Sequence, residues 1–426
     1  MKPERLRVTS VLRLRDFRRV WMAEVISDVG NFITFIALAL LIHDLTGKTF
    51  AVGVALALRS IPWFTLGPIA GVFVDRADRR VVMVVSDLAR AVLVTVLAFT
   101  HTTWQAYVIA FLSGCFGPFF RPARQALLPT IAPGDDYVKA LAVSEIAHLS
   151  LHTVGPAIGG LAVLALGARH AFFLDAGTFL ISAALVVGVT VRGAPRARHT
   201  GLGEVITDLI EGARFLGREK VLRSLVTSRA ATVFSGVAII ALLVGYINDD
   251  LHRGAGSYGI ALAMGGIGTV VLSVALARRG AAVRRARWLV LAAASPALYL
   301  VMAFRPGFVA LLLLMLAEGA AVTGLALYDD MVVAERTPDA ARGRVFGLSG
   351  ASAEAAEFVG ALVFTALGDS LGVPAAMSIA GGVAAGLGLL ALAPALGPLR
   401  ADDERRRSTA PPTAPPTAPG ADPPAG

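Results

Sequence analysis

Acidic side chains interrupt several long apolar stretches of this sequence, where an ionised group is costly. Four of these residues are Glu145, Glu318, Glu354 and Glu357. Burial away from water favours the neutral form of a carboxyl group, so such a residue can bind and release a proton. Proton-coupled movement of a solute needs this chemistry. The alternative for each residue is a permanently neutral carboxyl group that is hydrogen-bonded to a neighbouring helix.

Asp28 is a fifth acidic candidate, and basic residues accompany it in the apolar stretches. At 1.5 Å per helical residue, Asp28 lies roughly 10–12 Å from one end of its stretch. Arg59 lies at a similar depth from the opposite end of the next stretch, so the two side chains could approach each other. Arg90 follows Asp87 by three residues, which predicts a pair on one helix face. The intramembrane basic candidates are Arg59, Arg90, Arg121 and Arg229.

Metal binding and enzymatic catalysis have little support in the sequence. His148 and His152 share a helix face with Glu145, and this set could bind a metal, relay protons or simply line a polar cavity. Because there is no further Cys or His cluster, we predict no metal site. Gly47-Lys48-Thr49 lacks the earlier glycine of a phosphate-binding loop, and the common hydrolase motifs are absent. We expect neither an enzyme nor a cofactor.

The composition excludes a soluble protein. Of the 426 residues, 56% are hydrophobic and 16% are charged, and the mean hydropathy is +0.70. A soluble domain carries roughly 25% charged residues. The single cysteine, Cys115, also excludes a secreted scaffold held together by intrachain disulfides.

Twelve apolar segments have the length of membrane-spanning helices. Only helices and closed barrels satisfy the backbone in lipid, and apolar runs without alternation indicate helices. The sequence therefore predicts an all-α membrane protein with twelve transmembrane helices in two six-helix halves. The segments are 20–42, 51–74, 80–100, 104–127, 138–167, 171–191, 222–247, 257–278, 286–304, 308–333, 344–368 and 373–396.

The lysines and arginines indicate the orientation. With this topology, 32 of them lie on the side of the two termini and 4 on the other, while three lie within segments. Such an excess marks the cytoplasmic side, so both termini are expected in the cytoplasm of a bacterial inner membrane protein. This bias also explains the net charge of +9 without a nucleic-acid partner.

The chain divides near its middle. A linker with apolar residues at helical spacing separates the halves and predicts an amphipathic helix on the cytoplasmic membrane surface. The tail from Ser408 repeats Ala-Pro-Pro-Thr and is expected to be disordered. The predicted units are a basic cytoplasmic N-terminus (1–19), a six-helix bundle (20–191), the linker (192–221), a second six-helix bundle (222–396) and a disordered Pro-rich cytoplasmic tail (397–426).

The most specific motif joins the second and third segments. It reads Gly71-Val-Phe-Val-Asp75-Arg76-Ala-Asp78-Arg79-Arg80. This motif resembles the Gly-x-x-x-Asp-Arg-x-x-Arg-Arg signature of the major facilitator superfamily. The resemblance implies a latch that holds one state of a transport cycle, in which Asp75 lies against the N-terminus of the eleventh helix. Gly67 and Gly71 would let another helix approach closely. The alternative is ordinary positive charge around a cytoplasmic turn.

A second motif, in the fifth segment, combines a proline with glycines. Gly155, Pro156, Gly159 and Gly160 resemble the core of the antiporter motif of exporters in the same superfamily. Pro156 removes a backbone hydrogen bond and bends the helix, while the glycines permit close packing against the eighth helix or another neighbour. The glycines that usually precede this core are replaced here by bulky residues such as Leu151. The alternative is a proline kink that serves packing alone.

Further stretches, including 116–129, resemble the branch that holds macrolide-efflux and enterobactin-exporter-like carriers. This resemblance implies a proton-coupled exporter of small amphipathic compounds that works by alternating access. Its first, fourth, seventh and tenth helices would line the path. The expected partners are a small-molecule substrate, protons and the lipid bilayer, and we expect a monomer. The alternatives are uptake, a lipid-like substrate, or a receptor or scaffold that transports nothing.

Overall fold

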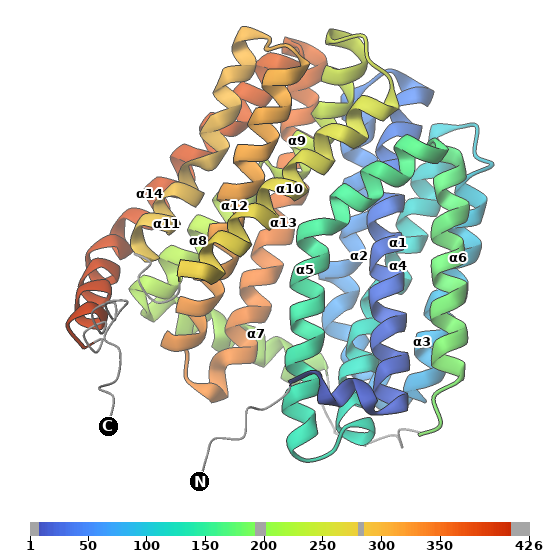
Figure 1. Ribbon diagram of the computed structural model, residues 1–426, viewed down its shortest axis with the longest axis vertical. Coiled ribbons are helices and arrows are strands. Elements are labelled where there is room, and N and C mark those ends of the chain that lie inside the picture. The colour runs from blue at the N-terminus through green and yellow to red at the C-terminus, as the bar shows by residue number, and fades with distance from the viewer. Residues whose placement is uncertain (1–7, 192–201, 280–284, 410–426) are drawn as a thin grey trace, which may run out of the picture.

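The computed structural model describes residues 8–191, 202–279 and 285–409, and these residues form helices joined by short turns (Figure 1). No β-strand occurs in these three ranges. The elements in chain order are η1 (Val8–Arg13), α1 (Arg15–Thr46), α2 (Thr49–Arg76), α3 (Arg79–Leu97), α4 (Thr103–Ile131), α5 (Asp135–Leu166), α6 (Ala168–Val187), α7 (Leu202–Arg218), α8 (Lys220–Val233), α9 (Gly236–Gly245), η2 (Tyr246–Asp250), α10 (Ala255–Arg279), α11 (Arg285–Ala294), η4 (Ser295–Phe304), α12 (Phe308–Arg336), α13 (Asp339–Leu371) and α14 (Val373–Thr409).

Every apolar segment predicted from the sequence coincides with helical residues, so the all-α membrane fold is confirmed. By length and composition, 7 helices of the described chain can cross a membrane, and shorter apolar helices accompany them. The number of twelve spans stays a prediction. Two of the predicted segments are divided: α8, α9 and the π-helical turn η2 follow one another in the first, and α11 and η4 in the second.

The outer surface of the helices is apolar, as expected for contact with lipid. On α3, Val85, Leu88, Val92 and Val96 are exposed and recur every three or four residues. Polar α3 side chains such as Asp87 are buried instead. A soluble protein shows the reverse arrangement, because its charged groups need water.

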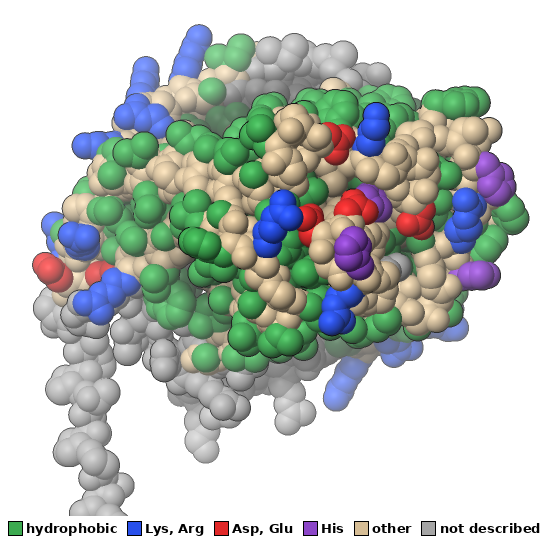
Figure 2. All heavy atoms as spheres, turned by 90° about the horizontal axis from the view of Figure 1, so that it is seen from above, with side chains coloured by type: hydrophobic (Ala, Val, Ile, Leu, Met, Phe, Trp, Pro, Cys, Tyr) green, Lys and Arg blue, Asp and Glu red, His purple; other side chains and the backbone are tan. Residues whose placement is uncertain are grey.

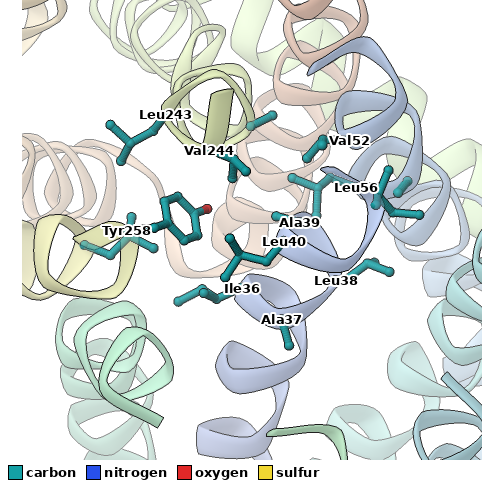
Figure 3. Packing of buried hydrophobic residues seen from close by; sticks show 14 of the residues in the cluster. Ile36, Ala37, Leu38, Ala39, Leu40, Val52, Leu56, Leu243, Val244 and Tyr258 are labelled. Atoms are coloured by element: carbon teal, nitrogen blue, oxygen red, sulfur yellow. The ribbon is translucent and has the colours of Figure 1, made fainter. Parts of the chain in front are cut away.

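Three hydrophobic cores show how the two groups of helices are joined. We use the name terminal end for the end of the molecule at which η1 lies and α14 stops. The opposite end is the distal end. At the distal end a single core combines α1 and α2 with α9 and α10, and Figure 3 shows Leu40 and Val52 opposite Val244 and Tyr258. At the terminal end α1–α6 and α7–α14 have separate cores. The two halves are therefore packed together distally and part towards the terminal end (Figure 1).

The helix between the halves is held by the second half. Helix α7 contacts α13, and the Arg344 guanidinium of α13 donates a hydrogen bond to Glu211 of α7. Gly212 faces the Arg344 side chain, since a Cβ there would lie 3.1 Å from Arg344 Cβ. Leu216 of α7 is part of the terminal core of the second half.

The chain is predicted to be disordered from residue 397, but in the structure α14 extends beyond that residue. The helix continues to Thr409, and two carboxylates fix its last turns. Asp402 forms an ion pair with Arg336 at the end of α12. Asp403 accepts a hydrogen bond from the Ala286 N–H at the start of α11, at 3.1 Å. The Pro-rich repeat beyond Thr409 lies outside the described residues.

Candidate functional site

A cluster of ionisable side chains joins α1, α4 and α5 midway along the first half. His148 Nδ1 lies 3.7 Å from Asp28 Oδ2, and its Nε2 lies 3.5 Å from a guanidinium nitrogen of Arg121. The side chains of Asp28 and His148 are 29% and 23% exposed. The imidazole thus lies between a carboxylate and a guanidinium, at a position that water reaches.

A buried ion pair lies one helical turn away, on the same two helix faces. Glu24 precedes Asp28 by four residues on α1, and Arg124 follows Arg121 by three on α4. Arg124 Nε is 2.9 Å from Glu24 Oε1, and both side chains are buried. Removing one partner of such a pair leaves an uncompensated buried charge, so the pair fixes the contact between α1 and α4.

Asp28 and Arg59 do not pair, contrary to the expectation from their depths. The Arg59 guanidinium is directed to Asn31, whose side-chain oxygen is 3.3 Å away. Asp28 faces α5 instead, where His148 lies. The position of a residue along a helix does not fix the direction of its side chain around the helix axis, which depends on packing.

Asp87 and Arg90 form the predicted local pair inside the first half. Arg90 Nη2 donates to Asp87 Oδ1 at 2.5 Å, and Ser182 of α6 donates to the other carboxylate oxygen at 2.6 Å. The guanidinium lies 4.3 Å from the centre of the Phe179 ring. Since Asp87 and Arg90 are both buried, this network ties α3 to α6.

On the second half, α13 presents Glu354 and Glu357 three residues apart on one side of the helix. Glu354 precedes Ala361 and Thr365 by seven and eleven residues, which places all three on one stripe of α13. Ala361 and Thr365 pack against Gly53 of α2 at the distal end. Glu354, nearer the terminal end of the same stripe, is exposed because the halves have parted there.

Glu357 lies deeper between α13 and α9. Its Oε1 would be 3.8 Å from a Cβ placed on Gly236, at the start of α9. Within the described part of the chain, neither Glu354 nor Glu357 forms a hydrogen bond or ion pair. No direct contact with a described residue therefore offsets a negative charge on either side chain.

Glu318 lies on the inner side of α12. Glu318 lies on a different side of α12 from the stripe of exposed residues Val309, Leu313 and Ala317. Glu318 is partly buried, and its α12 neighbour Gly319 packs directly on Gly265 of α10. The prediction that Glu318 lies near the middle of its helix is consistent with its position between Phe308 and Arg336.

Arg229 of α8 is held by two consecutive carboxylates of α12. Its Nη1 is 2.6 Å from Asp330 Oδ1 and 3.5 Å from Asp329 Oδ2. Asp329 is buried, whereas Asp330 and Arg229 are partly exposed. Because two acids face one base, this cluster carries a negative charge when all three groups are ionised.

The glycines of the proline motif pack α5 against helices of both halves. Cβ atoms on Gly155 and Gly159 would lie 2.1 Å from Phe32 Cδ2 and 2.7 Å from the Phe32 carbonyl oxygen of α1. A Cβ on Gly160 would lie 2.6 Å from the Gly259 carbonyl oxygen of α10. Helix α5 continues through Pro156. The predicted close packing of α5 against the eighth predicted segment, 257–278, which is α10 in the structure, is therefore present.

The arginine motif between α2 and α3 is described in part. Gly71 and the side chains of Asp75 and Arg76 lie outside the description. Arg79 is buried, and Arg80 donates to the Val187 carbonyl at 2.7 Å, within the first half. Nothing lies within 4 Å of a Cβ on Gly67. The close helix approach expected at Gly67 is absent here, because the halves have parted at this end.

Sequence reasoning missed Glu24, Asp175 and Asp329, although each lies inside a predicted span. Asp175 of α6 is fully buried and accepts a hydrogen bond from Thr34 of α1 at 2.5 Å. Gly30 leaves room for it, since a Cβ there would lie 1.9 Å from Asp175 Oδ1. The signal that selected the other carboxylates, an acid inside an apolar stretch, also applies to these three.

Metal ligation finds no support in the part of the chain that the structure describes, where no group of three His, Cys, Asp or Glu residues is suitably placed. The side chains of Glu145 and His152 lie outside that part. Exposed or partly exposed ionisable groups instead lie in both halves. Asp28, Arg121 and His148 lie in the first half, and Arg229, Glu354 and Glu357 lie in the second.

Comparison with known proteins gives a family match over almost the whole chain. The family described as "Transmembrane secretion effector" matches residues 8–418. The multidrug efflux pump Tap of Mycolicibacterium fortuitum is 29% identical over 84% of this chain and 90% of that protein. Macrolide efflux protein A of Streptococcus pyogenes is 27% identical over 34% of this chain and 37% of that protein. The match to the MFS-type transporter YfiS of Bacillus subtilis spans about half of that protein, at 29% identity over 47% of this chain and 49% of YfiS.

Solved structures share the fold. The nucleoside transporter NupG superposes with a TM-score of 0.71 at 12% identity, over 89% of this chain and 98% of that chain. A bacterial homologue of the human lysosomal transporter Spinster, in an inward-facing and unoccupied conformation, gives 0.64 at 12% identity over 92% and 98% of the two chains.

Proposed function

Because this chain belongs to the transmembrane secretion effector family of the major facilitator superfamily, we propose that it is a proton-coupled exporter of small amphipathic organic compounds. The resemblance inferred from the sequence motifs is confirmed by the match. The chain is a multi-pass membrane transporter and not an enzyme.

The lysines and arginines are in excess on the side of the two termini. This excess supports an orientation in which the terminal end faces the cytoplasm and the chain spans the bacterial inner membrane. With that orientation, the halves part on the cytoplasmic side and are packed together on the outer side. An exporter receives its compound from the cytoplasm in this state. Both halves belong to one chain, so a monomer is sufficient for alternating access.

The arrangement of Asp28 beside His148 carries the proposal of proton coupling. When the carboxylate is ionised, it is paired with the imidazole and lies near the positive charge of Arg121. A proton on Asp28 Oδ2 neutralises the carboxylate, weakens its attraction to α4 and α5, and leaves the positive charge of Arg121 less compensated. Binding of a proton and binding of a cationic compound then compete for the Asp28 carboxylate, as antiport requires.

Side chains of the second half support a substrate that has both apolar and charged parts. Glu354 and Glu357 are uncompensated acids on the second half, and they attract a cation that is removed from water. Phe234 of the same half is a partly exposed apolar side chain, and its ring packs edge to face on the buried Phe364 ring, with centroids 5.0 Å apart. The relatives named as multidrug and macrolide efflux proteins support the same substrate class.

The test uses the purified full chain in liposomes that contain a pH-sensitive dye. A proton gradient is imposed, and macrolides, cationic dyes and siderophores are added one at a time. We expect proton flux only with certain compounds, and at least a tenfold decrease in Asp28→Asn. Glu404→Gln, at an exposed acid of α14, is the matched control and should transport normally.

Two results would contradict the proposal. Absence of compound-dependent proton flux, with labelled compound still crossing the membrane, would show a uniporter or another coupling ion. Accumulation of compound on the side of the terminal end would show uptake. The variants Glu318→Gln and Glu354→Gln test which further carboxyl group carries the proton. Substitution of a coupling residue changes the number of protons moved per molecule of compound, whereas substitution of another residue leaves this ratio unchanged.

A further inference from the structure

The first turn of α2 is capped by a side chain from the other half of the molecule. The Asp369 carboxylate of α13 accepts a hydrogen bond from the Thr49 backbone N–H at 2.9 Å and from the Thr49 hydroxyl at 2.7 Å. Its second oxygen accepts from the Phe50 N–H at 3.3 Å. Thr49 and Asp369 are 320 positions apart.

Helix α2 has no cap of its own. Its N-cap residue, Lys48, makes no side-chain capping hydrogen bond. The first N–H groups of a helix have no partner within the helix and carry partial positive charge, so a carboxylate is their best acceptor. Asp369 therefore supplies both hydrogen bonds and charge to an end that would otherwise lack them.

The surrounding contacts allow this cap only while the distal end is closed. Thr49 is 2% exposed and is enclosed by glycines of the second half. Its Cγ2 would lie 2.6 Å from a Cβ on Gly245, and its Oγ1 2.8 Å from a Cβ on Gly368. Separation of the halves at this end must draw Thr49 out of this site and break all of its bonds to Asp369.

Helices α2 and α13 share the position of an aspartate near the helix end. Helices α2 and α13 run in opposite directions across the boundary between the halves. Each has an aspartate close to its C-terminus, Asp75 in α2 and Asp369 in α13. Asp369 lies at the N-terminus of α2, and the family resemblance assigns Asp75 to the N-terminus of α13.

We propose that Asp369 is the latch of the distal end: its cap on α2 holds that end closed, and release of the cap is required before the transporter opens there. The two ends of α2 then engage α13 alternately, through Asp369 in the state open at the terminal end and through Asp75 in the other state. This proposal rests on alternating access, which is part of the proposed function.

The experiment measures the opening of each end without any substrate. Cys115 is replaced by Ala, and spin-label pairs are placed at exposed loop residues. Thr102 and Gly307 report on the distal end, and Pro133 and Pro338 on the terminal end. Distances are measured by pulsed electron resonance on the full chain in lipid nanodiscs.

Asp369→Ala is expected to increase the ratio of distally open to distally closed molecules by about tenfold, the size expected for loss of a charged cap. The distal pair should gain a longer distance and the terminal pair a shorter one. Asp369→Asn keeps an acceptor oxygen and should shift the ratio less. Ser370→Ala is the matched control, since among the described residues its hydroxyl donates only to the Leu367 carbonyl of α13 itself.

Thr49→Val tests the same contact from the first half, with a side chain of similar shape that cannot donate. Thr49→Val should shift the spin-label distances in the same direction as Asp369→Ala. If Asp369→Ala does not fold, Thr49→Val still tests the contact. Unchanged distances in a folded variant, or a shift equal to that of Ser370→Ala, would overturn the latch. The distances need neither a proton gradient nor a substrate, so failure of proton coupling in liposomes would leave this result standing.

Discussion

Gly160 of α5 and Gly259 of α10 are in direct backbone contact across the boundary between the halves. A Cβ on Gly160 would lie 2.6 Å from the Gly259 carbonyl oxygen, and one on Gly259 would lie 2.2 Å from the Gly160 carbonyl oxygen. The distal end thus closes through two residues that have no side chain. Figure 2 views this end and shows acidic, basic and histidine side chains near its centre, among hydrophobic ones.

Gly160→Val should prevent this closure. The added atoms meet backbone, which cannot move aside, and overpacking costs about 1–3 kcal/mol. The population should therefore move towards the state that is open distally, with a longer Thr102–Gly307 spin-label distance. Gly177→Val is the control, because nothing lies within 4 Å of a Cβ there. Equal distance distributions in the two variants would show that the glycine contact does not control closure.

Asp28→Asn should separate binding from coupling. The amide keeps the shape of the carboxylate but loses the attraction to His148, which is 3.7 Å away. We expect binding of a transported compound to lose its pH dependence, while compound-driven proton flux falls at least tenfold. Binding titrations at several pH values check the first expectation, and dye-loaded liposomes the second. A variant whose binding keeps the pH dependence of the unmodified chain would exclude Asp28 as the coupling group.

Asp75→Asn should reduce turnover without loss of expression or fold. In the latch implied by the motif, this residue holds the terminal end closed, so its loss should favour the terminally open state by about tenfold. Transport rate and the Pro133–Pro338 distance are the measurements. Asp78→Asn is the matched control in the same loop, because Asp78 caps α3 through the Arg80 N–H at 2.9 Å and Asn caps equally well. Normal turnover in Asp75→Asn would contradict the latch.

Gly30→Ala should destabilise the first half. The new Cβ would lie 1.9 Å from Asp175 Oδ1 and 2.1 Å from Thr178 Oγ1, so the buried hydrogen bonds between α1 and α6 must be distorted. We expect a loss of about 1–3 kcal/mol, seen as a lower thermal unfolding temperature in detergent. Gly177→Ala, on α6 itself, should unfold close to the original temperature. A Gly30→Ala protein as stable as that control would show that the Asp175 site adapts easily.

The sequence alone determined the membrane location, the helices and the family. Hydropathy is a local property, and lipid requires each spanning segment to satisfy its own backbone, so apolar length is enough to find helices. The Asp87–Arg90 pair was predictable for the same reason, since a spacing of three residues on one helix fixes the contact. The packing glycines of α5 were predictable as a motif, although their neighbour on α1 was not.

Tertiary structure decided which distant groups meet and which end is open. Asp28 is paired with His148 instead of Arg59, and Asp369 reaches Thr49, because rotation about each helix axis is set by packing over the whole bundle. The sequence contains no signal for these partners. The open end depends on how the two halves are placed against each other, and this placement is set by contacts between residues that are far apart in the chain.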